Sequence, residues 1–567
     1  MKPKSLSLFL VAYATLLCLN SNAQPLVWNA EQFLHSYPQY QSGFQLPQKI
    51  VTASDNSVFV AGTFNFTNTF ARKIAVLKYD DTGDSITSVV VEDPGFNSAA
   101  LMNNYVNDML IDGSDNIYVL GTTSDSVTIN GLKYRGTSLL LKYDKDLNLE
   151  WQRHITHADM NSIIFDSNGN ICLNGSTKNN GDGTLTNMFT VVFDNNGNEL
   201  WRRRYASAGA YDDKGADIAA DGSGNVYIIG TSNVAGNGKQ LVTIKYDASG
   251  NTQWRKFFNT YLGAGAKDQA GSVAVSASGN VYISGVVTTG FSNVASRTML
   301  VCYNTNGTKQ WNKKATSTQG TYSLIPAKIR IDANENVYVC STRQPYSTTQ
   351  FTNNNKHIQV RKYSSSGVLQ WSAIKDTASV YDFDVTPVGD IYISGSKNNP
   401  FKFYAAKYNT GGTLDWEDIY APLVYNDQVG SGSYGTCLSI NQNNANAVTF
   451  GAFAQAAQPG SIYSTEWMTR QYNTAPRFGN DPQQISTEPL NELNVYPNPA
   501  QNQIFISSTV AMKDATVSIK NLVGQSVKNI SMNGFETSIG IGDLKSGIYV
   551  IDAINDGKHF MKKFVKQ

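Results

Sequence analysis

The chain contains one unit that recurs eight times between about Asp55 and Tyr472. The clearest copy reads Asp221-Gly-Ser-Gly-Asn-Val-Tyr-Ile-Ile-Gly230, followed by Ile244-Lys-Tyr-Asp-Ala-Ser-Gly-Asn-Thr-Gln-Trp254. A glycine closes the first half, and its copies are spaced by 54 to 59 residues: Gly62, Gly121, Gly175, Gly230, Gly285, Gly395 and Gly451, with Cys340 in the sixth copy. A period near 50 residues built from short strands and turns predicts a β-propeller.

Each unit resolves into four apolar runs separated by turn residues. In the fourth unit these runs are Ala216–Ala220, Val226–Thr231, Leu241–Tyr246 and Gln253–Phe258. Asp-Gly-Ser-Gly and Asp-Ala-Ser-Gly segments separate them, and both are typical of tight hairpin turns. Four antiparallel strands make one propeller blade. We expect the recurrent Tyr after the first turn and the Trp near the end of the unit, such as Tyr227 and Trp254, to pack between blades.

The eighth unit lacks its final Trp strand. Its third strand, Glu466–Tyr472, is followed by Asn473-Thr-Ala-Pro476, whereas Pro25-Leu-Val-Trp-Asn29 stands alone near the N-terminus. A closed ring leaves no sheet edge exposed, and an N-terminal strand joined to the last blade would close it. We therefore predict an all-β, eight-bladed propeller at residues 24–473, with Trp28 in the outer strand of blade eight. Seven blades is the alternative.

The composition bounds the class of protein. The 567 residues carry a net charge of +1, and only 16% of them are charged, so nothing indicates a nucleic acid or an anionic membrane as partner. Lys2 and Lys4, an apolar run from Leu6 to Leu19 and the small residues of Ser21-Asn-Ala23 together predict a signal peptide at residues 1–23. No later stretch is apolar and long enough to span a membrane. We expect an exported chain.

Cysteine and histidine offer few candidates for chemistry. After the signal peptide four cysteines remain, Cys172, Cys302, Cys340 and Cys437, each inside an expected strand. We interpret them as buried thiols, with disulfides as the alternative. The pair His154 and His157 lacks an evident third metal ligand. The Asp-rich turns resemble calcium loops superficially, but they lack the distal acid that such loops use, and we interpret them as hairpins. We predict no metal and no cofactor.

The texture changes after Pro476. Residues 474–490 are polar and proline-containing and form the predicted linker. Residues 491–567 are expected to fold as a small β-sandwich. They open with Leu493-Asn-Val-Tyr-Pro-Asn-Pro-Ala500, continue through Leu544-Lys-Ser-Gly-Ile-Tyr-Val-Ile551 and close with Lys558-His-Phe-Met-Lys-Lys-Phe-Val-Lys566. These features resemble the C-terminal sorting domain of type 9 secretion cargo. The resemblance implies the type 9 machinery as a partner, export through the outer membrane and attachment to the cell surface.

The blades resemble secreted β-propeller repeats, a family that is defined by its repeat and implies no activity. Their Trp-containing turns also resemble quinoprotein docking motifs, but the adjacent cysteine pair common in those enzymes is missing. Function in propellers sits in loops that gather on one face near the axis. Here these loops are long and rich in Tyr and Asp, which suits contacts to glycans or peptides. Our candidate ligand-binding residues are Asp108, Tyr211, Asp212, Asp217 and Tyr261.

The competing hypothesis is a polysaccharide-degrading enzyme with carboxylates at the propeller axis. Asp108, Asp217 and Asp382 occupy one position of the repeat, which holds Ser162, Ser272 and Lys328 in other units. Glycoside hydrolysis needs two such carboxylates roughly 5–10 Å apart. We predict no catalytic residue and favour binding or scaffolding, for glycan or protein ligands, over catalysis.

Overall fold

The structure is a computed structural model in which contacts divide the chain into two units, Met1–Ala475 and Pro476–Gln567. It describes residues 26–32, 45–65, 72–91, 104–129, 132–178, 186–208, 212–258, 268–288, 296–314, 322–345, 356–375, 377–397, 402–420, 423–424, 428–429, 432–441, 447–457, 463–473, 493–496, 500–521, 525–555 and 558–566. All regular elements in these ranges are strands, which confirms the all-β prediction. The predicted signal peptide and linker lie outside them.

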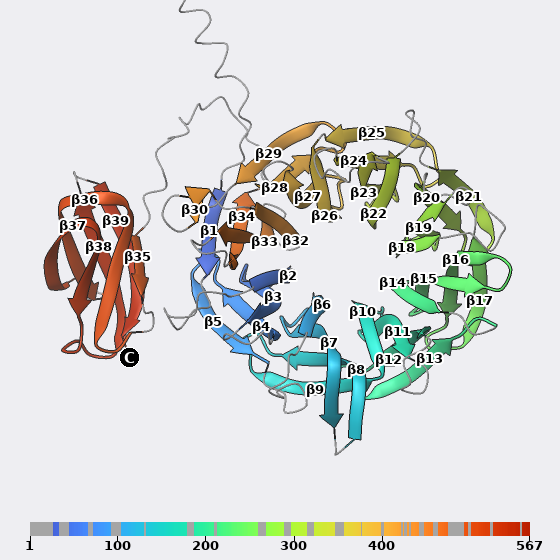
Figure 1. Ribbon diagram of the computed structural model, residues 1–567, viewed down its shortest axis with the longest axis horizontal. Helices are drawn as coiled ribbons and strands as arrows, with labels where there is room; N and C mark the ends of the chain where they lie inside the picture. The colour runs from blue at the N-terminus through green and yellow to red at the C-terminus, as the bar shows by residue number, and fades with distance from the viewer. Residues whose placement is uncertain are drawn as a thin grey trace, which may run out of the picture. The chain divides into compact units, whose positions relative to one another are not determined.

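The described part of the first unit forms eight four-stranded antiparallel sheets arranged as a ring (Figure 1). We number them as blades along the chain. Blades 1 to 4 are β2 (Gln45–Thr52), β3 (Val58–Asn65), β4 (Arg72–Tyr79), β5 (Ser85–Val90); β6 (Asn104–Ile111), β7 (Ile117–Ile129), β8 (Leu132–Tyr143), β9 (Leu149–Thr156); β10 (Ala158–Phe165), β11 (Ile171–Lys178), β12 (Thr186–Phe193), β13 (Glu199–Tyr205); and β14 (Asp213–Ala220), β15 (Val226–Val234), β16 (Gly238–Tyr246), β17 (Thr252–Phe258).

Blades 5 to 7 follow the same order, and a two-stranded sheet precedes blade 8. They are β18 (Gln269–Val275), β19 (Val281–Thr288), β20 (Ser296–Tyr303), β21 (Lys309–Lys314); β22 (Tyr322–Ile331), β23 (Val337–Pro345), β24 (His357–Tyr363), β25 (Leu369–Lys375); and β26 (Ala378–Val385), β27 (Ile391–Lys397), β28 (Lys402–Tyr408), β29 (Leu414–Tyr420). The small sheet pairs β30 (Leu423–Val424) with β31 (Gln428–Val429). In every blade the first strand lies toward the centre of the ring (Figure 1).

Blade 8 takes its outer strand from the other end of the chain. It comprises β32 (Gly432–Ile440), β33 (Ala447–Ala457), β34 (Tyr463–Asn473) and the N-terminal β1 (Leu26–Gln32). Strand β1 pairs antiparallel with β34, and Trp28 lies opposite Gln471. This pairing confirms the predicted closure, in which the last blade borrows a strand from the N-terminus.

The strand register corrects two of the glycine positions. In blades 1 to 5 and 7 the glycine lies four residues after the first residue of the second strand, as Gly230 does after Val226. Counted in this way, blade 6 has Ser341 in that position, opposite Pro326, and the predicted Cys340 is one residue too early. In blade 8, Val448 pairs with Tyr472 as Val226 pairs with Tyr246, so Ala452 replaces the predicted Gly451.

The Asp-containing segments are hairpin turns held by their own side chains. In blade 4 the Asp221 carboxylate accepts hydrogen bonds from the backbone N–H groups of Ser223 (2.9 Å) and Asn225 (3.0 Å) and from the Tyr227 hydroxyl (2.8 Å). Burial opposes ionisation of Asp221, but these donors hold its pKa below the ordinary value. Gly224 takes the positive φ of 76° that the turn needs. The carboxylate therefore has a structural role within the turn.

The Trp residues join neighbouring blades as predicted. The indole N–H groups of Trp201 and Trp254 donate to the carbonyl oxygens of Ala248 (3.0 Å) and Thr305 (2.9 Å) in the outer turn of the next blade. The recurrent Tyr side chains, such as Tyr227, are fully buried and pack against the Trp of their own blade. All four described cysteines are buried and free, so their interpretation as thiols is confirmed. Burial raises the pKa of the Cys437 thiol to about 12.

The second unit is one rolled five-stranded sheet. Its strands are β35 (Leu493–Tyr496), β36 (Gln503–Asn521), β37 (Ser526–Gly540), β38 (Gly547–Asn555) and β39 (Lys558–Lys566). Strand β36 pairs with β35 at its start and with β38 at its end, and the Ala500 N–H donates to the Val565 carbonyl (2.8 Å). The sheet thus curls around its own apolar core, close to a barrel, where the sequence predicted a small sandwich.

Candidate functional site

The inner strands of the ring place one residue of each blade in an equivalent position. Each inner strand contains a β-bulge, which leaves part of the backbone ladder unpaired at that point. Three positions before the last residue of the strand, just after the bulge, stands the equivalent residue. We call the set the inner belt; in blade order it consists of Lys49, Asp108, Ser162, Asp217, Ser272, Lys328, Asp382 and Cys437.

Side chains of the inner belt accept backbone hydrogen bonds from the next blade. Asp108 accepts from the N–H of Ile163 (3.1 Å) and Asp217 from the N–H of Val273 (3.1 Å). Ser272 does the same for Ile329 (3.2 Å), and Asp382 for Leu438 (3.3 Å). In each case the donor directly follows the belt residue of its own blade. The belt therefore satisfies N–H groups at the bulges and links blades side by side.

Asp108 and Asp217 also receive side-chain donors from neighbouring blades. The Lys49 ammonium lies 3.0 Å from the Asp108 carboxylate. The hydroxyls of Ser162 and Ser272 donate to the two oxygens of Asp217 over 3.1 and 2.6 Å. Two candidate residues that we expected to bind a ligand are thus used in contacts between blades.

Asp382 is the most shielded of the three belt carboxylates. It is 8% exposed and forms an ion pair with Lys328 of blade 6 at 3.0 Å. Burial favours the neutral form, but Lys328, Lys49 and Arg330 together hold the pKa of Asp382 below its ordinary value. A carboxyl that stays ionised cannot donate a proton as a general acid near neutral pH.

The three carboxylates belong to blades 2, 4 and 7, so no two of them lie in adjacent blades. The contacts described above are with Lys, Ser and backbone N–H groups. The sequence identified the shared position of the three Asp residues. It did not identify Lys49 and Cys437 as members of the belt, because the bulge that aligns them is not visible as a motif.

The remaining candidate residues divide into described and undescribed ones. Asp212 is exposed and accepts hydrogen bonds from the backbone N–H (2.9 Å) and hydroxyl (3.0 Å) of Thr186, so it ties the start of blade 4 to blade 3. Tyr211 and Tyr261 lie outside the described residues, as do most of the long loops between blades. Their predicted role in ligand binding stays a prediction.

Two further properties concern metals and membranes. Within the described ranges, no group of three or more His, Cys, Asp or Glu side chains is arranged to hold a metal ion. The same ranges contain no helix that is long and apolar enough to cross a membrane.

Together, the ring of sheets and the separate C-terminal unit define a β-propeller with a sorting tail. Residues 494–567 match the family described as secretion system C-terminal sorting domain. Residues 200–237, in blades 3 and 4, match the family described as β-propeller repeat. Both recognitions made from the sequence are confirmed. The sorting domain implies export by the type IX secretion machinery, with release or attachment at the cell surface. A search of the curated proteins found no match.

Solved structures with a similar arrangement are distant. The Dos1 propeller is 10% identical, with a TM-score of 0.42 over 78% of this chain and 95% of that one. PorZ, a surface component of the type-IX secretion system of Porphyromonas gingivalis, is 13% identical, with a TM-score of 0.31 over 91% and 74%. The polysaccharide lyase Uly1 is 13% identical, with a TM-score of 0.39 over 65% and 90%. At these scores the likenesses carry no argument about function.

Proposed function

We propose that this protein is an exported, surface-attached propeller that binds glycan or protein ligands and catalyses no reaction at its axis. One observation carries the proposal: the three inner-belt carboxylates are each bound by groups of neighbouring blades. A hydrolase needs one carboxyl that is protonated and a second that is available to water or substrate. Asp382, held ionised, and Asp217, bound by two hydroxyls and an N–H, are poorly suited to these roles.

The proposed binding surface is the face formed by the long loops that connect outer strands to the next inner strands. These loops differ in length and sequence between blades, and an asymmetric ligand needs such differences. The opposite face offers mainly short Asp, Asn and Gly hairpins, which are similar from blade to blade. Tyr211 and Tyr261 would supply aromatic contacts on the loop face, beside Asp212.

The test is a screen of the purified mature chain on glycan and peptide arrays, with product analysis for every ligand that binds. The proposal predicts binding without chain cleavage, and binding that falls when Tyr211 and Tyr261 are both replaced by Ala at unchanged Tm. Cleavage of a bound polysaccharide would instead establish the alternative, a degrading enzyme. Unchanged affinity of the double variant would overturn the placement on the loop face.

A further inference from the structure

Two of the eight blades carry an arginine at a position that is apolar in the other six. The position lies on the third strand, two residues before the aromatic residue that pairs with the start of the second strand. Arg361 occupies it in blade 6 and Arg470 in blade 8. The other blades have buried apolar side chains there, which belong to the cores between blades: Leu77, Leu141, Val191, Ile244, Val301 and Ala406.

Arg470 has a carboxylate partner on the preceding blade. Its guanidinium lies 3.2 Å from Asp418 of blade 7, and its Nε donates to the Tyr472 hydroxyl (2.9 Å). The Tyr472 hydroxyl in turn donates to Asp418. Asp418 stands two residues after Trp416 on the outer strand β29. An arginine 6% exposed is therefore neutralised by one carboxylate supplied from that position.

The interface between blades 5 and 6 repeats this arrangement without the carboxylate. Tyr363 takes the place of Tyr472, since both pair with the first core residue of the second strand. The place of Asp418, two residues after the outer-strand Trp, is taken by Lys313, which follows Trp311. A cation thus stands where the other interface has an anion.

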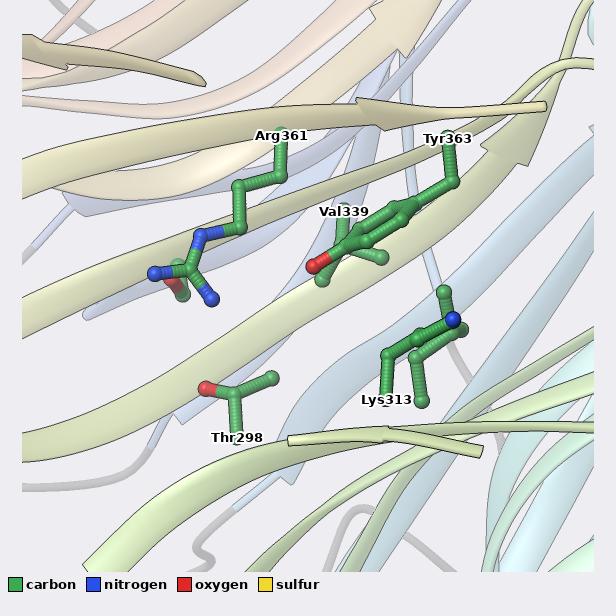
Figure 2. Close-up of a pocket in the computed structure, with 7 residues that line it drawn as sticks. Thr298, Lys313, Val339, Arg361 and Tyr363 are labelled. Carbon is green, nitrogen blue, oxygen red and sulfur yellow. The ribbon is translucent and has the colours of Figure 1, made fainter. Parts of the chain in front are cut away.

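A pocket opens at this place between the two blades (Figure 2). Thr298, Leu300 and Lys313 line it from blade 5, and Val339, Ser341, Arg361 and Tyr363 from blade 6. It has space of about 10 Å³, enough for one water-sized particle, and none of its lining residues is acidic. The pocket therefore combines two positive side chains with room for one small group.

Neutral groups around the pocket do not balance its charge. With its amide oxygen turned toward Arg361, Gln359 accepts from Nε (3.3 Å) and Nη2 (3.1 Å) of the guanidinium. The hydroxyl of Thr298, a residue 5% exposed, has no hydrogen-bond partner in the described part of the chain. A half-buried guanidinium beside a lysine is stabilised far more by an anion than by an amide oxygen.

We propose that this pocket binds a small monovalent anion, of the size of chloride, in place of the carboxylate that Asp418 provides at the other interface. The anion lies between Arg361 and Lys313 and accepts hydrogen bonds from Arg361 and from the hydroxyls that line the pocket. The limited space excludes phosphate, sulfate and sugar acids. The site stabilises the contact between blades 5 and 6 and is independent of the ligand proposed for the loop face.

The first test compares the Tm of the full mature chain in 0.15 M sodium chloride and in 0.15 M sodium gluconate, whose anion is too large for the pocket. We expect a Tm higher by roughly 1–2 °C in chloride. Lys313→Asp should abolish this difference because it supplies the missing carboxylate, and Arg361→Leu should abolish it because it restores the apolar residue of the sister blades. Lys256→Asp is the matched control: Lys256 has the same position in blade 4 but faces the interface that contains Val301. It should keep the chloride dependence.

The second measurement locates the ion directly, by anomalous diffraction of crystals grown in sodium bromide. A bromide peak within contact distance of Arg361 supports the proposal, and it does so whether or not the two variants fold. A water molecule in the pocket at high bromide, or a chloride dependence of Tm that persists in Arg361→Leu, would overturn it.

Discussion

The indole ring of Trp201 lies directly over Gly250 of the next blade. A β-carbon built on Gly250 would approach the Trp201 Cδ2 atom to 2.6 Å, and Gly250 has a φ of +79°. Equivalent contacts join Trp254 to Gly307, Trp311 to Gly367 and Trp371 to Gly412. The outer turn of one blade thus forms the surface on which the Trp of the preceding blade packs, and each indole N–H donates to that turn.

This contact predicts that Gly250→Ala destabilises the propeller for two reasons, the positive φ and the clash with Trp201. Gly236 separates them, since it has a φ of +76° but no atom within 4 Å of an added β-carbon. We expect Gly236→Ala to lower the free energy of unfolding by about 1–2 kcal/mol and Gly250→Ala by roughly 2–5 kcal/mol. Urea unfolding measures both. Equal losses in the two variants would show that Trp201 does not constrain the turn.

Ring closure predicts a strong dependence on the N-terminal strand. Residues of β1 pair with β34 from Leu26 opposite Tyr472 to Gln32 opposite Trp467, and without β1 the edge of β34 is unpaired. A chain lacking residues 24–32 should therefore melt at a clearly lower temperature than the wild type. A synthetic peptide of residues 24–32 added in trans should raise the Tm again, whereas a peptide of scrambled sequence should not. An unchanged Tm after the deletion would mean that the ring does not depend on this strand.

The ion pair of Lys328 and Asp382 predicts a contribution to stability that depends on pH. The pKa of Asp382 is lower in the folded chain than its ordinary value, so its contribution is fully present above the unfolded pKa and is lost as the pH falls through the folded pKa. The Tm of the wild type should thus fall more steeply below about pH 4 than that of Asp382→Asn. Asp194→Asn, in an exposed turn, controls for general acid effects. Parallel acid profiles of wild type and Asp382→Asn would refute the assigned role.

The match of residues 494–567 predicts that the two units can be separated. Deletion of residues 491–567 should leave the Tm of the propeller unchanged, because its core clusters contain no residue of the second unit. The same deletion should abolish delivery to the cell surface in a host with type IX secretion. Fractionation of cells that express both forms measures this. Surface delivery of the truncated chain would contradict the assignment of the tail.

Local patterns made much of the fold predictable. The turn sequence Asp221-Gly-Ser-Gly224 determines its own hydrogen bonds, and the missing Trp strand of the last unit indicated the role of Trp28. Counting a fixed period placed Cys340 and Gly451 in the glycine position, one residue from Ser341 and Ala452, because the spacing of the repeat varies between blades.

The chemistry of the axis could not be predicted in the same way. The partners of Asp108 and Asp217 come from the neighbouring blades, and the bulges determine which residues meet. Asp212 looked available in the sequence but is used by Thr186, more than 20 residues away in the chain. Polar residues near the axis of a repeat protein therefore need the three-dimensional register before a functional role can be assigned.

The role of the inner belt is the central claim, and the variant Asp217→Asn tests it most directly. The amide keeps the shape of the carboxylate but accepts fewer hydrogen bonds, so the bonds from Ser162, Ser272 and Val273 cannot all persist. We predict a clear fall in Tm, and no release of reducing ends from a panel of polysaccharides by either the wild type or the variant. An unchanged Tm together with polysaccharide cleavage by the wild type that disappears in the variant would contradict the account and assign Asp217 to catalysis.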